Sequence, residues 1–135
     1  MRTSALAAAL VAVLFHGAFA ADSSPPFLLQ WGSQGTGPGQ FSNPVSVHLD
    51  ENGLVYVADL SNHRIQVFDM EGNHVDTWGT PGMGDGQFLF PYDAVTHDGF
   101  VYVADSVNDR IQKLTLDGSF VSNWGGAGSG DGQFE

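Results

Sequence analysis

Apolar and polar residues alternate along most of the chain after residue 30, with the period of two that a half-buried β-strand requires. This alternation predicts strands over 45–49, 55–57, 64–68 and 74–78, and an Asn-Gly pair at 52–53 predicts the turn between the first two. Outside the first twenty residues no segment keeps a 3.6-residue period. The pattern therefore predicts an all-β fold with four short antiparallel strands joined by Gly and Asp turns.

The same pattern then occurs again. The string Val-Tyr-Val-Ala-Asp stands at 55–59 and 101–105, and Asn-x-Arg-Ile-Gln stands at 62–66 and 108–112. Trp-Gly and Gly-Gln-Phe each occur three times, at 31–32, 78–79 and 124–125, and at 39–41, 86–88 and 132–134. A period of 46 or 47 residues is typical of β-propeller blades, each a four-stranded antiparallel sheet.

We therefore predict a β-propeller of which about two and a half blades are present. A signal peptide (1–20) precedes a propeller segment (21–135) with a closing strand over 27–31. Repeat one spans 32–78, repeat two spans 79–124, and a third repeat begins at 125–135. Because a ring needs roughly four to eight blades, we expect the chain to be an N-terminal fragment of a longer propeller or the product of an incomplete gene prediction, with the remaining blades in missing sequence.

Some polar positions are the same in both copies and flank the turn between the second and third strands. Short polar side chains in such turns bond nearby backbone groups and tolerate left-handed backbone, and the arginine can reach the aspartate. We interpret these positions as structural: Asp59, Asn62 and Arg64 in repeat one, and Asp105, Asn108 and Arg110 in repeat two.

Other positions in the same turns differ between the copies. Because strands alternate in direction, these turns and the links between blades emerge at one end of the propeller. The differing residues there are free to recognise a partner, and the alternative that they are idle loop residues stays open. They are Leu60, Ser61, His63, Ser106, Val107 and Asp109.

The N-terminus has the features of a secretory signal peptide. Arg2 precedes an apolar run over 5–15, and Ala-Phe-Ala at 18–20 matches a cleavage site. No second long apolar segment follows, so we expect a secreted chain without a membrane anchor. Without Arg2, three basic and fifteen acidic residues leave a formal charge of 3 − 15 = −12. Such a charge disfavours nucleic acid as a partner.

No pattern in the chain predicts catalysis, a cofactor or a metal site. Cysteine is absent, no nucleophile motif is present, and the Gly-rich strings lack the lysine of a phosphate-binding loop. The histidines His48, His63, His74 and His97 stand at non-equivalent repeat positions, which does not suggest a shared zinc site. We expect them to be structural or exposed to solvent.

Together these motifs resemble the NHL repeat. The resemblance covers residues 27–134 and rests on Gly-Asp-Gly-Gln-Phe, a following proline, Val-Tyr-Val-Ala-Asp and Asn-x-Arg-Ile-Gln. Two departures weaken individual strands. The glycine usual after the proline is Ser46 and Asp93, and Lys113 and Thr115 interrupt the third strand of repeat two. The family implies a six-bladed or similar propeller.

The resemblance also implies two functions. Members commonly act as interaction modules, so a protein, peptide or glycan ligand is the first expectation. The alternative is a secreted peptidyl-α-hydroxyglycine α-amidating lyase, a related zinc enzyme with histidines directly after certain prolines. Val45 and Tyr92 follow Pro44 and Pro91 here, so neither repeat supplies that ligand.

Overall fold

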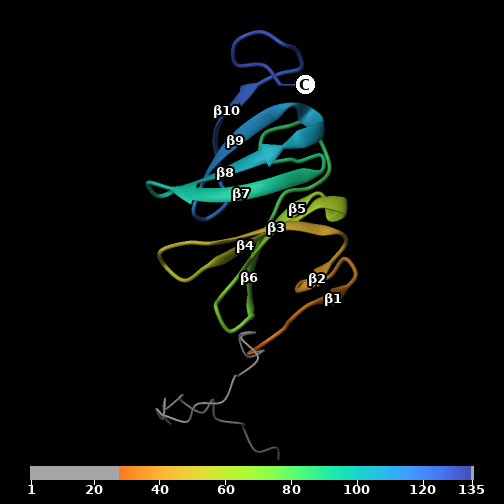
Figure 1. Ribbon diagram of the computed structural model, residues 1–135, viewed down its shortest axis with the longest axis vertical. Helices are drawn as coiled ribbons and strands as arrows, with labels where there is room; N and C mark the ends of the chain where they lie inside the picture. The colour runs from red at the N-terminus through yellow and green to blue at the C-terminus, as the bar shows by residue number, and fades with distance from the viewer. Residues whose placement is uncertain (1–27, 135) are drawn as a thin grey trace, which may run out of the picture.

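The computed structural model describes residues 28–134 (Figure 1). The predicted signal peptide lies outside these residues, as do Phe27 and Glu135. Two four-stranded antiparallel sheets, stacked one above the other, make up most of the fold, as the alternation predicted. Between residues 28 and 134 no helix is long and apolar enough to cross a membrane.

The first sheet, blade one, contains four strands that pair in chain order. They are β3 (Pro44–Leu49), β4 (Val55–Asp59), β5 (Arg64–Phe68) and β6 (His74–Trp78). Each coincides with a predicted strand or extends it by a residue or two. Val55 pairs with Phe68, and Tyr56 with Val67. Adjacent residues of a strand point to opposite faces, so these two pairs lie on opposite faces of the blade.

The second sheet, blade two, repeats this arrangement. Its strands are β7 (Pro91–His97), β8 (Phe100–Asp105), β9 (Arg110–Thr115) and β10 (Phe120–Gly125), again paired in chain order. Strand β9 runs without interruption through Lys113 and Thr115, contrary to the expectation that these residues break it. The ammonium of Lys113 lies 3.6 Å from the centre of the Phe100 ring, so the lysine stays at the surface of the sheet.

A short 3₁₀ turn connects the second and third strands of each blade, η1 (Leu60–Asn62) and η2 (Ser106–Asn108). The left-handed residues that close these turns are His63, with φ of 55°, and Asp109, with φ of 50°. The expectation that Asn62 tolerates left-handed backbone is therefore misplaced by one residue. Asn62 stays within the 3₁₀ turn, where its side chain can reach back to Asp59.

The chain enters each blade through the same Gly-rich link. In the first link β1 (Ser33–Gln34) pairs in parallel with β2 (Gln40–Phe41), and single bridges join Pro81 to Phe88 and Ala127 to Phe134 in the later links. Within each link a glutamine side chain accepts a hydrogen bond from a glycine N–H, as Gln40 does from Gly37 at 3.0 Å.

The predicted closing strand over 27–31 stays a prediction, because the blade that it would complete is not among the described residues; residues 28–31 pair with neither of the two sheets. Trp31 lies on the face of blade one, with its ring centre 6.2 Å from that of Phe68. A Cβ on Gly72 would lie 2.8 Å from the Trp31 ring, and a Cβ on Gly118 would lie 2.4 Å from Trp78. Trp31 therefore contacts blade one as Trp78 contacts blade two.

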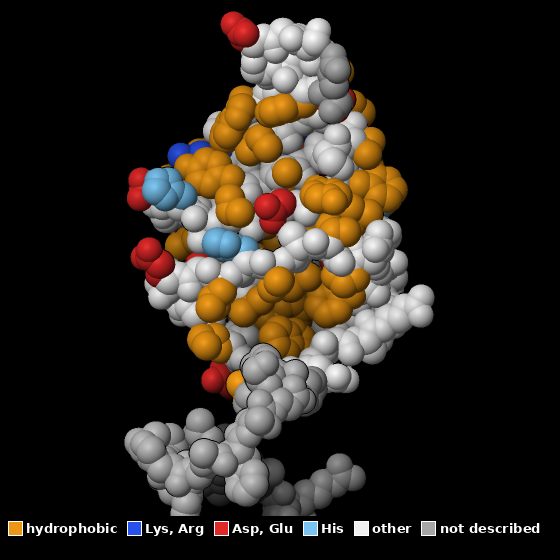
Figure 2. Space-filling view, in the orientation of Figure 1, with side chains coloured by type: hydrophobic (Ala, Val, Ile, Leu, Met, Phe, Trp, Pro, Cys, Tyr) orange, Lys and Arg blue, Asp and Glu red, His pale blue; other side chains and the backbone are white. Residues whose placement is uncertain are grey.

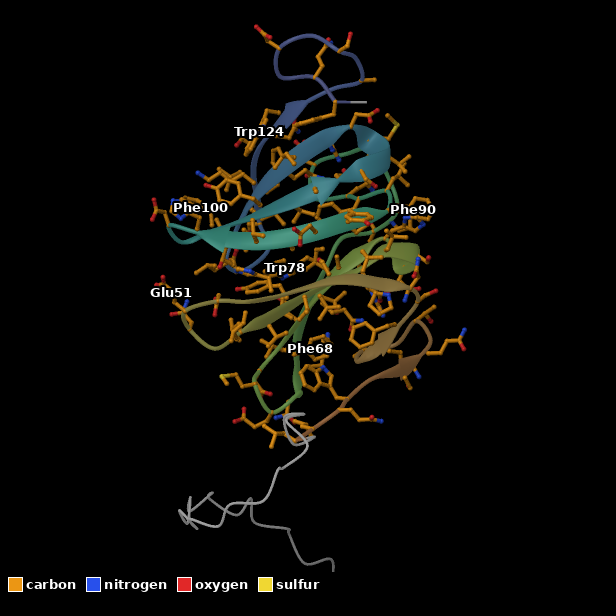
Figure 3. All side chains as sticks on the ribbon, viewed as in Figure 1. Glu51, Phe68, Trp78, Phe90, Phe100 and Trp124 are labelled. Carbon is orange, nitrogen blue, oxygen red and sulfur yellow. The ribbon has the colours of Figure 1, made fainter. Side chains whose placement is uncertain are left out.

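The main core lies between the two blades. The residues that meet there come from β4, β5 and β6 of blade one, from β7, β8 and β9 of blade two, and from the link. They are Tyr56, Ala58, Ile65, Val67, Trp78, Phe88, Ala94, Val101, Val103 and Leu114. Figure 3 shows Trp78 between the blades and Phe68 on the opposite side of blade one. A smaller cluster there joins Phe68 to Val55, Val57 and Phe41.

Candidate functional site

A buried carboxylate lies under the 3₁₀ turn of each blade. Asp59 is fully buried, and its Oδ2 accepts hydrogen bonds from Arg64 Nε at 2.7 Å, Asn62 Nδ2 at 2.8 Å and Gln66 Nε2 at 3.1 Å. Its Oδ1 accepts one from the Ser42 N–H at 2.7 Å. The ion pair that the sequence suggested between Asp59 and Arg64 is present, and it is part of a larger network.

Blade two builds the same network around Asp105. The carboxylate accepts hydrogen bonds from Arg110 Nε at 2.8 Å, Asn108 Nδ2 at 2.8 Å and Gln112 Nε2 at 3.2 Å. The Leu89 N–H donates to its other oxygen at 2.7 Å. Because a buried charge is costly unless it is paired and hydrogen-bonded, each network depends on all of its members.

The arginines also bind the links between blades. Arg64 donates from Nη1 and Nη2 to the carbonyl oxygens of Thr36, Gly37 and Gln40, at 2.6, 3.0 and 2.7 Å. Arg110 makes the equivalent bonds to Met83, Gly84 and Gln87. The turns and links thus lie at one end of the molecule, and the repeated polar residues hold them together.

The six predicted partner-binding residues lie at this end but do not form one cluster. Ser61, Ser106 and Val107 are exposed, and Leu60, His63 and Asp109 are half-buried. The Ser61 N–H donates to the Ser42 carbonyl, so this turn contacts the first link. Of the six, His63, Ser106 and Val107 hydrogen-bond to one shared segment, residues 89–90, which enters blade two.

That segment contains Phe90, which the sequence reasoning missed. Its N–H donates to His63 Nδ1 at 3.1 Å, and its ring packs edge-on against the His63 ring at 4.4 Å. Its carbonyl accepts the Ser106 hydroxyl at 2.6 Å, and the Val107 N–H donates to the Leu89 carbonyl at 3.2 Å. The bond to Nδ1 requires the His63 tautomer with its hydrogen on Nε2.

The backbone of Phe90 is left-handed, with φ of 54°. For a bulky residue this is an uncommon and costly conformation. Asn43 occupies the equivalent position before β3 with φ of 56°, and asparagine adopts this region readily. The signal was therefore present in the sequence as a Phe-Pro pair aligned with an Asn-Pro pair.

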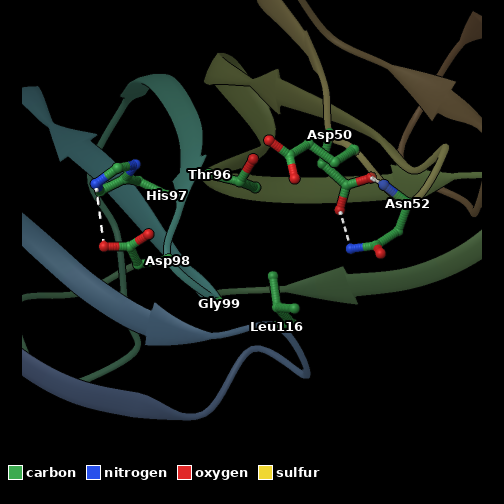
Figure 4. A pocket seen from close by; sticks show the side chains of 8 residues that line it. Asp50, Asn52, Thr96, His97, Asp98, Gly99 and Leu116 are labelled. Atoms are coloured by element: carbon green, nitrogen blue, oxygen red, sulfur yellow. Dashed lines mark hydrogen bonds and ion pairs between the residues drawn. The ribbon is translucent and has the colours of Figure 1, made fainter.

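A hollow lies at the opposite end of the molecule, between the turns that join the first and second strands of each blade (Figure 4). Its volume is about 270 Å³, and its lining includes Asp50, Thr96, His97 and Leu116. Asp50 accepts the N–H groups of Asn52 and Leu54, both at 2.8 Å. Its carboxylate therefore closes its own turn, as expected of this segment.

Burial raises the pKa of Asp50, but hydrogen bonds from Leu54, Asn52 and Tyr56 outweigh burial and leave that pKa below its usual value. Burial, the charge of Asp50 and the hydrogen bond to Asp50 together raise the pKa of Tyr56 to about 12. These opposite shifts favour a charged Asp50 carboxylate hydrogen-bonded to a neutral Tyr56 phenol.

The histidines are dispersed. His48 Nε2 lies 2.8 Å from Thr96 Oγ1 and accepts the Thr96 N–H at 3.1 Å, which links the two blades. His74 bonds Thr77, and His97 lies 3.3 Å from Asp98 at the surface. Within residues 28–134, no three His, Asp or Glu side chains lie close enough together to hold a metal ion.

Comparison with known proteins identifies the repeat. The family described as NHL repeat matches residues 41–68. The chain is 48% identical over 58 residues to human NHL repeat-containing protein 3, covering 41% of this chain and 17% of that protein. It is 40% identical over 62 residues to the protein brain tumor of Drosophila melanogaster, covering 46% of this chain and 6% of that protein.

The match to human E3 ubiquitin-protein ligase TRIM32 is 48% identical over 46 residues, covering 34% of this chain and 7% of that protein. The chain therefore spans less than a fifth of these relatives. A solved structure, a putative exported protein from Bacteroides fragilis, superposes with a TM-score of 0.57 at 18% identity, covering 70% of this chain and 27% of that one. This likeness supports the β-propeller fold.

Proposed function

We propose that the NHL repeats of which this chain is built bind a protein or peptide partner through their turn end. The binding area is the turn-end surface, defined as His63, Phe90, Ser106 and Val107. NHL repeats are interaction modules, which supports the general role. The single observation that carries the specific proposal is the exposed Phe90 ring, held in a left-handed backbone by residues from two blades.

The conformational strain at Phe90 suggests that this residue has a function. A left-handed non-glycine residue costs on the order of 1–3 kcal/mol, and such strain gathers at functional positions. Phe90 nevertheless keeps 37% of its surface exposed, and Val107 beside it keeps 56%. An aromatic ring that is both fixed and exposed is the type of residue that dominates binding energy at protein interfaces.

The surface is also rigid before a partner arrives. The Asp59 and Asp105 networks fix the two turns, and hydrogen bonds to His63 and Ser106 fix the Phe90 backbone. Binding at this surface therefore loses less conformational entropy than binding at a mobile loop, because the loop would have to become ordered.

The negative charge of the chain indicates which kind of partner surface it can bind. The chain has a formal net charge of −11, and Arg64 and Arg110 are already paired with buried carboxylates. Complementary potentials speed and orient association, so the partner presents a neutral or basic surface with an apolar residue for Phe90. We place this partner outside the cell, because the first twenty residues resemble a secretory signal. Nothing among residues 28–134 favours the zinc-lyase alternative.

A peptide library displayed on phage and selected against the full chain tests the proposal. Peptides enriched on the chain are then titrated against Phe90→Asn, which installs the residue that repeat one uses at the same left-handed position. We expect affinity to fall by tenfold or more, the effect of losing one aromatic anchor, while thermal stability holds or rises.

The matched control is Val121→Ser, which removes an exposed apolar residue of β10 away from the turn end. This variant should bind as the unaltered chain does. A selection that enriches no peptide, or peptides that bind Phe90→Asn with undiminished affinity, would rule out the turn-end surface as the binding area.

A further inference from the structure

Two histidines of blade one each accept a backbone N–H from the chain that begins blade two. His48 of β3 accepts the Thr96 N–H on Nε2 at 3.1 Å, and His63, which closes the η1 turn, accepts the Phe90 N–H on Nδ1 at 3.1 Å. Phe90 immediately precedes β7, and Thr96 lies near the end of β7. The two bonds therefore fasten β7 to blade one at both of its ends.

The junction between the blades is otherwise apolar. Within the described part of the chain, His48 and His63 make every hydrogen bond that joins blade one to residues 89–125. Because β7 is an edge strand of blade two, the N–H groups on its outer side have no neighbouring strand to bond. Figure 2 shows histidine side chains that reach the surface near the boundary between the blades.

Both bonds require a neutral imidazole. His48 accepts on Nε2 and so carries its hydrogen on Nδ1, whereas His63 accepts on Nδ1 and so carries its hydrogen on Nε2. In a protonated histidine both ring nitrogens are donors. Protonation therefore places one N–H against another at each of the two contacts.

The contact at His63 loses more than the contact at His48. Among residues 28–134 the Phe90 N–H has no other acceptor, and its backbone is left-handed. At the other contact the Thr96 hydroxyl oxygen lies 2.8 Å from His48 Nε2, so it can accept the hydrogen that protonation adds. The bond to Phe90 is therefore lost outright, and the bond to Thr96 is partly replaced.

The surroundings of His63 provide no counter-charge for a protonated ring. In its own hairpin Asp59 and Arg64 are paired with each other. The turn also contacts the start of blade one, where residues 42–44 carry no charge. The link before blade two has a single charged side chain, Asp85, which lies against β10. Protonation of His63 thus removes a bond without creating an ion pair.

The surroundings of His48 are more acidic. The titratable side chains on the elements packed around it come from its own turn, from β4, from β7 and from the first turn of blade two. They are Asp50, Glu51, Tyr56, Asp93, His97 and Asp98. Within residues 28–134 none of them forms an ion pair with His48, but their negative charges favour a charged ring. His63 should therefore contribute most of the response to acid.

We infer that the junction between the two blades is an acid-sensitive contact. The two bonds are present while His48 and His63 are neutral, and they are lost as the pH falls through the range in which histidine titrates, near about 6.5. Losing one hydrogen bond lowers the folding equilibrium constant about fivefold. Phe90 belongs to the turn-end surface, so acid would also weaken a partner bound there. That consequence rests on the proposed function, whereas the tests of the junction do not.

Non-titrating substitutions in the full chain test the inference. His63→Asn and His48→Gln each place an amide oxygen near the position of the accepting ring nitrogen, so both keep an acceptor. Asparagine also adopts the left-handed backbone of residue 63 readily. The matched control is His74→Gln, because His74 is exposed and bonds only Thr77 of its own strand. Far-UV circular dichroism checks that each variant keeps the fold.

Urea unfolding is followed by tryptophan fluorescence at about pH 7.5 and about pH 5.5, on either side of the histidine range. Between the two conditions the unaltered chain and the control should lose about fivefold more of the folding equilibrium constant than the double variant does. Comparing variants cancels the response of the carboxylates, which all of them share. A double variant that responds to acid as the unaltered chain does, or a control that abolishes the response, would overturn the inference.

Nuclear magnetic resonance of the unaltered chain provides a measurement that needs no variant. Proton–nitrogen correlations of the imidazole rings should show opposite tautomers near neutral pH, with hydrogen on Nδ1 of His48 and on Nε2 of His63. On acidification the amide protection factors of Phe90 and Thr96 should fall, and that of Phe90 should fall further. Hydrogen on Nδ1 of His63 near neutral pH, or constant protection at Phe90 across the range, would contradict the acid-sensitive contact.

Discussion

Replacing Asp59 by alanine removes the centre of the network under the first turn. The carboxylate is fully buried and accepts four hydrogen bonds, one of them from the guanidinium of Arg64. The substitution leaves that guanidinium with only 12% of its side chain exposed and without its counter-ion. The stability of blade one should therefore fall sharply.

The size of the stability loss depends on how many hydrogen-bond donors the substitution leaves without an acceptor. Asn62 Nδ2 and Gln66 Nε2 keep second acceptors, the carbonyls of Gly35 and Gln40. Arg64 Nε and the Ser42 N–H have no second acceptor in the network. At about 1–3 kcal/mol for each unsatisfied buried donor, the loss is about 2–6 kcal/mol, and breaking a buried ion pair from one side costs about 3–5 kcal/mol. We expect about 4 kcal/mol.

Urea unfolding followed by tryptophan fluorescence measures the loss, since Trp78 is buried between the blades and reports on their separation. Asp105→Ala should lose a similar amount, because Asp105 accepts the same set of bonds in blade two. The exposed Asp85 serves as the control, and Asp85→Ala should stay within about 0.5 kcal/mol of the unaltered chain. A loss below about 1 kcal/mol for Asp59→Ala would refute the network as a source of stability.

Two further predictions concern a glycine and a tyrosine. Gly118→Ala should lower the free energy of unfolding by about 3 kcal/mol, because alanine is strained in this left-handed backbone and its Cβ would lie only 2.4 Å from the Trp78 ring. Gly86 is also left-handed but has nothing within 4 Å of a Cβ, so Gly86→Ala should lose only the backbone strain, about 1 kcal/mol. Equal losses in urea unfolding would contradict the contact with Trp78. The pKa of Tyr56 is raised by burial, by the charge of Asp50 and by their hydrogen bond to about 12, so its contribution is fully present below pH of about 10 and is lost as pH rises toward 12. Tyr56→Phe should show a smaller loss of stability across that alkaline range, and an unchanged pH profile would argue against the shifted group.

Part of the site was accessible from the sequence. The pair of Asp59 with Arg64 is separated by only five residues across one turn, so repeated spacing sufficed to suggest it. Phe90 was missed because its partner His63 lies 27 residues away on another blade. The left-handed position at His63 was misplaced by one residue because turn type depends on backbone geometry that composition only approximates.

By itself the sequence determined the strands, the blade length and the repeated turns, because alternation and turn chemistry act between near neighbours. The tertiary structure alone decided which face of each strand is covered, that Trp31 lies on the face of blade one, and how His63, Phe90 and Ser106 meet. Those outcomes depend on how one sheet stacks on the next, and burial is shared between residues too distant in the chain for any local pattern to specify.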